Sequence, residues 1–125
     1  MPAHYDLIVI GGGSGGLACA QRAADHGAKV ALAEPRPLGG TCVNAGCVPK
    51  KVMYYAASLA EEIRDAAGYG FDVDTRGHDW RKLKAARDAY VQRLNGIYAG
   101  NLEKRGIVHL RHAARFAGPD TVVAG

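Results

Sequence analysis

A glycine run between an apolar segment and an alanine-rich segment restricts the fold of this 125-residue chain more than any other feature. The run, Gly-Gly-Gly-Ser-Gly-Gly, occupies residues 11–16, and residues 5–10 before it predict a short buried strand. Residues 17–26 carry apolar side chains at helical spacing, and Gly27 suits a helix C-cap. Residues 29–34 predict a second buried strand. This order makes a βαβ unit, so the predicted fold class is α/β with a parallel sheet.

The middle of the chain predicts a helix from about residue 41 to about residue 67. Prolines and glycines at residues 35–40 mark a loop before it. We expect an interruption near Gly46 and Pro49, because proline lacks a backbone donor and crowds the preceding turn.

The last part of the chain predicts a long helix, a strand and a hairpin. Asp79 suits the N-cap of an amphipathic helix over residues 80–105. Residues 107–110 predict a third strand, and residues 116–123 predict a hairpin around Gly118-Pro119-Asp120. The apolar positions of the long helix are Leu83, Tyr90, Leu94, Ile97 and Leu102.

The glycine turn has the spacing of a dinucleotide-binding loop. Gly11, Gly13 and Gly16 satisfy G-x-G-x-x-G, which allows a tight turn, close approach to a pyrophosphate and close helix–strand packing. The helix that follows would offer free N–H groups and its positive dipole end to phosphates. Glu34 stands at the spacing of a ribose ligand, and its carboxylate would repel a 2′-phosphate, so FAD or NAD(H) is expected and NADP(H) is not. The alternative is a tight turn with a surface glutamate.

Two of the three cysteines, Cys42 and Cys47, lie five residues apart on a predicted helix. Only a distorted helix brings them together, so a disulfide between them would be strained, as catalytic or labile disulfides are. A helix N-terminus and Lys50 favour the reactive thiolate. Buried core cysteines, a metal site and chance are the alternatives; the histidines are scattered, so no metal ligand is assigned. Cys19 is expected to be a small core residue.

Composition disfavours nucleic-acid and membrane partners. The chain has 16 Lys+Arg and 12 Asp+Glu, and its net charge of +4 is spread, which favours solvated helix faces over a nucleic-acid surface. No apolar run approaches the ~20 residues that span a bilayer. The first residues lack the pattern of a signal peptide, so we expect a cytoplasmic protein.

Residues 39–51, Gly-Gly-Thr-Cys-Val-Asn-Ala-Gly-Cys-Val-Pro-Lys-Lys, resemble the redox-disulfide signature G-G-T-C-x-N-x-G-C-x-P of the flavin-dependent pyridine-nucleotide–disulfide oxidoreductases. Residues 5–16 are similar to the FAD-binding start of that family, and the likeness extends through residues 87–91 and 93–95. Lys50-Lys51 resembles the branch that reduces glutathione, trypanothione or thioredoxin disulfides, whereas lipoamide and mercuric types usually have Ser-Lys there. The resemblance implies a Rossmann-like FAD-binding domain, of which residues 1–125 form an incomplete, N-terminal part.

The resemblance also implies a reaction. Electrons would pass from NADPH to FAD, then to a Cys42–Cys47 disulfide, and then to oxidised glutathione. Cys47 would lie against the flavin, and Cys42 would attack the substrate disulfide. Lys50 would lie near the flavin N5, where a cation stabilises the reduced, anionic flavin.

Further roles follow from the same resemblance. The substrate contacts fall on Ser14, on Arg22, which would pair with a glycyl carboxylate, and on Tyr98, which would cover the peptide as a gate. Gln21 stands where some relatives have a second arginine, and Ala45 stands where valine is common. The cofactor contacts fall on Gly11, Gly13, Ser14, Gly15, Gly16, Glu34, Gly40, Thr41, Lys50 and the backbone of Ala114.

Parts of that machinery have no counterpart in this sequence. It contains no second G-x-G-x-x-G for NADPH and no His-x-x-x-x-Glu-Glu segment, which supplies the acid from the partner subunit in this family. We therefore expect a fragment that is inactive alone, whose NADPH and interface domains lie outside residues 1–125 and whose full-length form is a homodimer. A related reductase for another disulfide and a stand-alone flavin or nucleotide module are the alternatives. An uncovered sheet edge and an uncovered face of residues 80–105 would favour aggregation.

Overall fold

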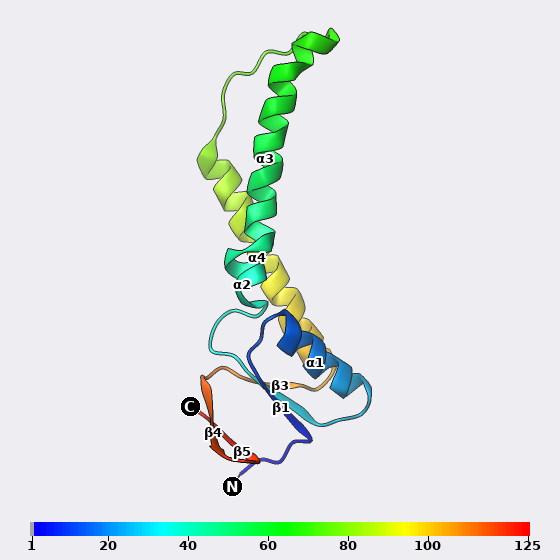
Figure 1. Ribbon diagram of the computed structural model, residues 1–125, viewed down its shortest axis with the longest axis vertical. Coiled ribbons are helices and arrows are strands. Elements are labelled where there is room, and N and C mark those ends of the chain that lie inside the picture. Colours follow the sequence, from blue (N-terminus) through cyan, green and yellow to red (C-terminus); the bar gives the residue numbers. More distant parts are fainter. Residues whose placement is uncertain (1) are drawn as a thin grey trace.

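The computed structural model describes residues 2–125 as a small α/β base from which a long helical arm projects (Figure 1). The base contains a three-stranded sheet of β1 (Leu7–Ile10), β2 (Val30–Ala33) and β3 (Val108–Leu110). All three strands are parallel, in the order β1-β2-β3, with Leu7 opposite Val30 and Ala31 opposite Val108. The predicted α/β class and parallel sheet are confirmed.

The core of the base forms around β2, whose four residues are all buried. Helix α1 (Ser14–Asp25), which connects β1 to β2, contributes Leu17 and Ala20 to this core. Leu102 comes from the far end of α4 (Trp80–Lys104), and the other buried members are Val30, Leu32, Leu38 and Ile107. The sheet, α1 and the end of α4 thus share one apolar cluster.

Cys19 is exposed, so the expectation of a small core residue is wrong. Each helical residue turns by about 100°, which places Cys19 about 200° from Leu17 around α1. Leu17 and Ala20 face the core, and Cys19 therefore faces away from it.

The helix expected from residue 41 to residue 67 is divided at Gly46, as predicted. The first part is α2 (Gly40–Ala45) and the second is α3 (Cys47–Asp65), which continues as the short η1 (Ala66–Tyr69). The backbone of Gly46, at φ −129° and ψ −115°, is not helical.

Pro49 does not break α3. It is the third residue of that helix, where the backbone N–H has no partner within the helix, so the missing donor costs little. The backbone N–H of Lys50 donates to the carbonyl of Gly46 at 3.0 Å and begins the regular bonding.

The arm consists of α3 and the first part of α4, joined at its tip by η1 and an extended segment (Figure 1). Asp79 caps α4 as predicted, since its Oδ1 accepts from the N–H groups of Arg81 at 2.9 Å and Lys82 at 3.2 Å. Of the five apolar positions expected on this helix, Leu102 alone is fully buried, while Tyr90 and Ile97 are exposed. The arm carries α4 away from the core, which leaves these positions without a covering layer.

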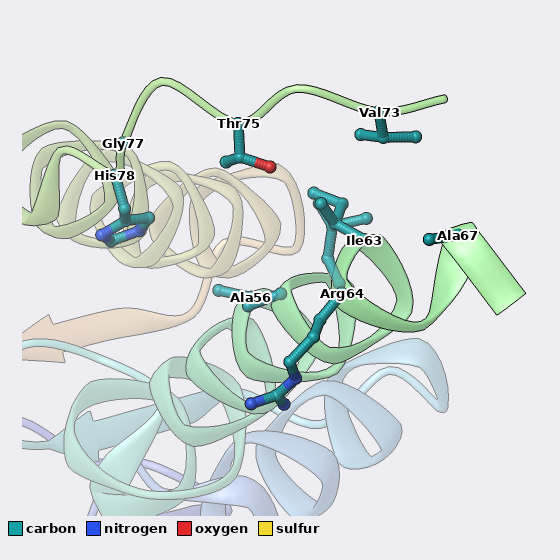
Figure 2. A pocket seen from close by; sticks show the side chains of 10 residues that line it. Ala56, Ile63, Arg64, Ala67, Val73, Thr75, Gly77 and His78 are labelled. Carbon is teal, nitrogen blue, oxygen red and sulfur yellow. The ribbon is translucent and has the colours of Figure 1, made fainter. Parts of the chain in front are cut away.

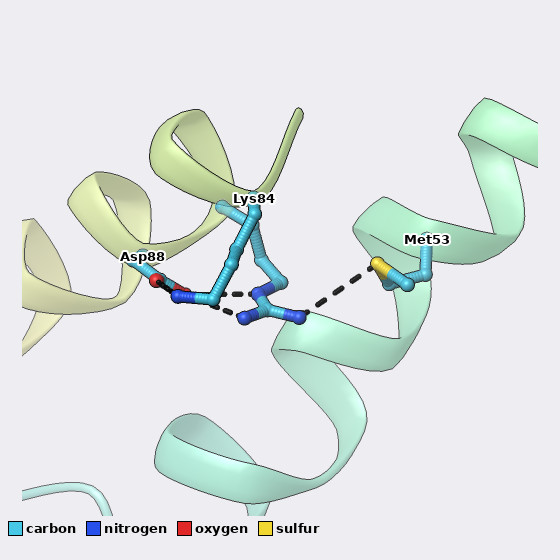
Figure 3. Close-up of polar contacts among 4 residues, drawn as sticks. Met53, Lys84 and Asp88 are labelled. Carbon is cyan, nitrogen blue, oxygen red and sulfur yellow. Dashed lines mark hydrogen bonds and ion pairs between the residues drawn. The ribbon is translucent and has the colours of Figure 1, made fainter. Parts of the chain in front are cut away.

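Arg87 connects the two helices of the arm. Its Nη1 lies 3.8 Å from the sulfur of Met53 on α3, and its Nη2 donates to Asp88 at 2.7 Å (Figure 3). Lys84 also binds Asp88, and these two cations hold the pKa of that carboxyl below its usual range.

The chain ends in a hairpin of β4 (Ala114–Gly118) and β5 (Thr121–Ala124), which begins two residues earlier than predicted. Its two strands form a separate antiparallel sheet. Within residues 2–125, no helix is both long enough and apolar enough to cross a membrane.

Candidate functional site

The loop between β1 and α1 has the tight turn and the close packing that its glycines allow. Gly11 has a φ of +105°, and its N–H donates to the carbonyl of Ala33 at 2.8 Å. A Cβ on Gly16 would overlap the carbonyl oxygen of Gly11, so only glycine lets α1 begin this close to the strand.

The N-terminus of α1 suits an anion. No side chain caps it, and its first turn holds no acidic residue, so the N–H groups at the positive end of the helix dipole have no side-chain partner within α1. A Cβ added at Gly15 would meet nothing within 4 Å, which leaves room for a group to approach the backbone. A phosphate fits the free N–H groups of such a turn.

Glu34 fixes the same loop from the end of β2. Its Oε2 accepts from the N–H of Gly12 at 2.9 Å, and its Oε1 accepts from the N–H of Arg36 at 2.9 Å. Each carboxylate oxygen has a further lone pair, so Glu34 retains acceptor capacity for hydroxyl groups. A Cβ on Gly12 would lie 2.8 Å from Leu38 Cδ2 and 2.9 Å from the Cβ of Glu34. The G-x-G-x-x-G motif allows any residue at position 12, so it did not predict that close packing requires glycine there.

The start of α2 packs directly against the glycine loop. Gly40 has a φ of +66°, and a Cβ there would lie 2.8 Å from the Cα of Gly13. The N–H of Gly39 donates to the carbonyl of Gly12 at 2.8 Å. The two glycine-rich segments of the sequence therefore meet backbone to backbone.

A cavity of about 450 Å³ opens beside this contact. It brings together three of the predicted cofactor residues, Glu34, Gly40 and Thr41, at the end of β2 and the start of α2. The remaining lining residues are Pro35, Arg36, Pro37, Asn44 and Ala45. With the open N-terminus of α1, this arrangement fits a dinucleotide whose phosphates lie at α1 and whose ribose reaches Glu34.

Cys42 and Cys47 lie on the two sides of the Gly46 break and are free thiols. The neighbouring Cys47 side chain, together with desolvation, raises the pKa of Cys42 above its ordinary value. A hydrogen bond from the Cys47 backbone and the charge of Lys50 lower the pKa of Cys42. Lys50 thus favours the Cys42 thiolate, as expected, but the opposing effect of the Cys47 side chain and of desolvation is larger.

Two asparagines hold the turn that carries Cys42. Asn44 Nδ2 lies 2.9 Å from the carbonyl oxygen of Gly40, 3.1 Å from that of Pro37 and 3.4 Å from that of Leu38. Asn95 Nδ2, from α4, donates to the carbonyl of Leu38 at 2.7 Å and to Asn44 Oδ1 at 2.9 Å. The only sequence signal for this network was the presence of both asparagines in the segments that carry the family resemblance.

The other candidates are placed less closely together. Lys50 is exposed in the first turn of α3, near enough to Cys42 to affect its pKa, and Ala114 begins β4. Arg22 is exposed on α1, about two turns beyond Ser14, whereas Tyr98 packs against the core cluster of the base. Ser14, Arg22 and Tyr98 share none of the cavities described here.

Another cavity, of about 440 Å³, lies in the arm between α3 and the segment that leads into α4 (Figure 2). Ile63, Arg64, Val73 and His78 are among its lining residues, and none of the predicted site residues is. In the described part of the chain, no group of three or more His, Cys, Asp or Glu side chains could hold a metal ion.

Comparison with known proteins gives a consistent family. The sequence profile of the pyridine nucleotide-disulphide oxidoreductases matches residues 5–124. The chain is 60% identical over 111 residues to a glutathione reductase of Yarrowia lipolytica, a match that covers 86% of this chain and 24% of the relative. Glutathione reductases of Schizosaccharomyces pombe and Debaryomyces hansenii are each 52% identical over 120 residues, covering 94% and 90% of this chain and 26% and 24% of the relatives. The chain thus spans about a quarter of the length of these curated relatives.

Proposed function

The chain belongs to the pyridine nucleotide-disulphide oxidoreductase family, and we propose that it forms the FAD-binding and redox-disulfide part of an NADPH-dependent glutathione-disulfide reductase. One observation carries the proposal: the helix that bears Cys42 packs, through Gly40, against the dinucleotide loop at Gly13, and the Cys47 side chain is the neighbour that most raises the pKa of the Cys42 thiol. Their attachment to the loop keeps them beside a bound dinucleotide.

FAD fits the residues around the loop. The open N–H groups of α1 at Ser14 and Gly15 would hold the pyrophosphate, Glu34 would bind the ribose hydroxyls, and Thr41 lines the same cavity as Glu34. The backbone of Ala114 would contact the adenine. When bound, FAD supplies two-electron transfer between a nicotinamide and the disulfide.

The two cysteines would divide the work. After the Cys42–Cys47 disulfide takes up two electrons and two protons, the Cys42 thiolate attacks one sulfur of oxidised glutathione and releases the first glutathione thiol. Cys47 then attacks the sulfur of Cys42, which releases the second glutathione and restores the disulfide. Each departing thiolate takes a proton, so the donor must be close to the pair.

Lys50 would support both reactions. Its charge already lowers the pKa of Cys42 and so partly offsets the effect of the neighbouring sulfur. We also propose that this cation lies beside the flavin ring and favours the reduced, anionic form.

The substrate residues are proposed by resemblance. Ser14 and Arg22 lie on α1, and the Arg22 guanidinium would pair with a glycyl carboxylate of glutathione. Tyr98 would reach the peptide from α4, although its half-buried ring now packs against the core cluster. Gln21 cannot supply a second cation, because its side-chain nitrogen donates to the carbonyl of Leu17 at 3.0 Å and carries no charge.

The complete reaction requires parts that residues 1–125 do not supply. We propose that NADPH binds a separate domain, that the proton donor comes from a partner subunit, and that the working protein is a cytoplasmic homodimer. On this basis residues 1–125 alone would not catalyse turnover. Reduction of the Cys42–Cys47 disulfide by an added dithiol, which is itself oxidised to a disulfide, with no NADPH-driven reaction, is the expected behaviour of the chain by itself.

The test compares serine variants of each cysteine in the full-length protein with oxidised glutathione as substrate. Cys42→Ser should abolish turnover while flavin is retained, and Cys47→Ser should do the same, whereas the exposed Cys19→Ser should keep wild-type activity. Wild-type turnover by Cys42→Ser would contradict the proposed interchange role. Faster reduction of lipoamide or trypanothione disulfide than of oxidised glutathione would retain the chemistry and reassign the substrate.

A further inference from the structure

We propose that Asn95 is a positioning residue for the Cys42–Cys47 pair, acting through Asn44. The inference rests on the proposed function, since it concerns how readily these two sulfurs form and lose their disulfide. Asn95 lies on α4, more than 45 positions from either cysteine in the sequence, and its side chain forms two hydrogen bonds with the segment 38–44 that carries Cys42.

The side-chain nitrogen of Asn95 is fully used. It carries two hydrogens, and it donates one to the carbonyl of Leu38 at 2.7 Å and the other to Asn44 Oδ1 at 2.9 Å. Leu38 belongs to the loop before α2, and Asn44 belongs to the end of α2. A single side-chain amide of α4 therefore binds both the loop before α2 and the end of α2.

The contact also fixes the direction of the Asn44 amide. With its oxygen held by Asn95, the nitrogen of Asn44 points toward the carbonyls of Gly40 and Pro37. These bonds close the preceding loop onto α2, the helix that also carries Cys42. Without the donor on Asn95, the oxygen of Asn44 would lose its partner and the amide could rotate away from those carbonyls.

Asn44 stands between the two cysteines, two residues after Cys42 and three before Cys47. Gly46, two residues after Asn44, has a non-helical backbone and separates the two cysteines. The hydrogen-bonded side chain of Asn44 therefore fixes the chain just before this break. Holding this anchor keeps Cys42 near Cys47 and raises the effective concentration of one thiol at the other. The arrangement therefore favours the disulfide over the dithiol.

The reaction to be measured is exchange of the pair with glutathione. The dithiol and one oxidised glutathione give the Cys42–Cys47 disulfide and two reduced glutathione molecules, with both thiol protons passing to the glutathione sulfurs. We expect Asn95→Leu to lower the equilibrium constant for this oxidation about tenfold, which corresponds to a potential about 30 mV less negative. Asn95→Asp should lower it at least as much, because a carboxylate presents only acceptors to the two oxygens.

The experiment uses the full-length protein with Cys19→Ser, equilibrated in glutathione buffers of known ratio, then quenched and labelled with iodoacetamide for mass spectrometry. Asn101→Leu is the matched control, since it is the same change on the same helix, about 9 Å further along the axis. Far-UV circular dichroism at the same temperature identifies any variant that has lost its fold. In an Asn44→Ala background, Asn95→Leu should give a smaller shift than it gives alone, because only the bond to the Leu38 carbonyl remains to be lost.

The outcomes separate this inference from the proposed function. A folded Asn95→Leu variant with a wild-type equilibrium constant, or an equal shift in Asn101→Leu, would overturn the positioning role while leaving the disulfide chemistry intact. An Asn95→Leu shift that persists in full on top of Asn44→Ala would also overturn it. If the wild-type protein formed no reversible Cys42–Cys47 disulfide at all, the proposed function would fail first.

Discussion

The Glu34 carboxylate binds the backbone N–H of Gly12 at 2.9 Å and so joins the end of β2 to the loop that follows β1. The same side chain accepts from the N–H of Arg36 at 2.9 Å, which bends the chain back after the strand. A residue expected from its spacing to bind a ribose therefore also shapes the loop that would bind the phosphates. Its replacement should affect both properties.

We expect Glu34→Ala to destabilise the chain by about 1–3 kcal/mol, because it removes a charged acceptor from the part-buried N–H of Gly12 and from the exposed N–H of Arg36. Urea unfolding followed by circular dichroism measures this change. Glu103→Ala on the exposed surface of α4 should change stability by less than about 0.5 kcal/mol. Equal effects of the two variants would show that the loop contact adds nothing.

Gly40→Ala should cost more than about 1 kcal/mol, since its φ of +66° disfavours a side chain and its Cβ would lie 2.8 Å from the Cα of Gly13. FAD affinity of the full-length protein, measured by flavin fluorescence, should fall with it. Gly100→Ala is the opposite case, because that helical glycine has nothing within 4 Å of an added Cβ. It should stabilise the chain by about 0.5–1 kcal/mol, and a loss of stability there would contradict the geometry of α4.

Cys47→Ala should make Cys42 more reactive at neutral pH. The neighbouring sulfur raises the pKa of Cys42, so its removal lowers that pKa and increases the thiolate fraction at any pH below it. The larger thiolate fraction should make alkylation by iodoacetamide faster at neutral pH. The rate profile against pH, recorded under reducing conditions with Cys19→Ser, should move to lower pH.

The lysines next to the pair supply the control for this experiment. Lys50→Met, added to Cys47→Ala, should move the profile back to higher pH, because the Lys50 charge lowers the pKa of Cys42. Lys51, whose ammonium lies 5.7 Å from the centre of the Tyr55 ring, should have little effect when changed to Met. Identical profiles for the Lys50 and Lys51 variants would argue against the assigned charge effect.

Asp79→Ala should destabilise α4 by about 1 kcal/mol, because it removes the acceptor of the N–H groups of Arg81 and Lys82. The change appears as a lower urea midpoint. Asp74→Ala, in the exposed segment before the cap, provides the comparison and should leave the midpoint unchanged.

Local patterns predicted most of the fold. The βαβ unit, the Asp79 cap and the division at Gly46 each depend on a few adjacent residues, and each occurs where expected. The exposure of Cys19 was not predicted, because alanine-rich helices leave little contrast between their faces. Pro49 was misjudged for another reason: its effect depends on its place within the helix, which a pattern does not define to one residue.

The candidate site was harder to anticipate where it depends on distant contacts. Glu34, Gly40 and Thr41 were assigned by motif and share one cavity. The bond from Asn95 to Asn44 joins residues 51 positions apart, and no local pattern encodes such a pair. The raised pKa of Cys42 likewise follows from the nearness of a second sulfur, which spacing alone cannot measure.

The backbone contact between Gly13 and Gly40 has a mechanical consequence. With no side chain between them, the two segments cannot slide apart without opening a void or move closer without a clash. The segment proposed to hold the phosphates is therefore in direct backbone contact with the start of the helix that bears Cys42. A methyl group at Gly40 would lie too close to the Cα of Gly13 and would push this helix away from the loop.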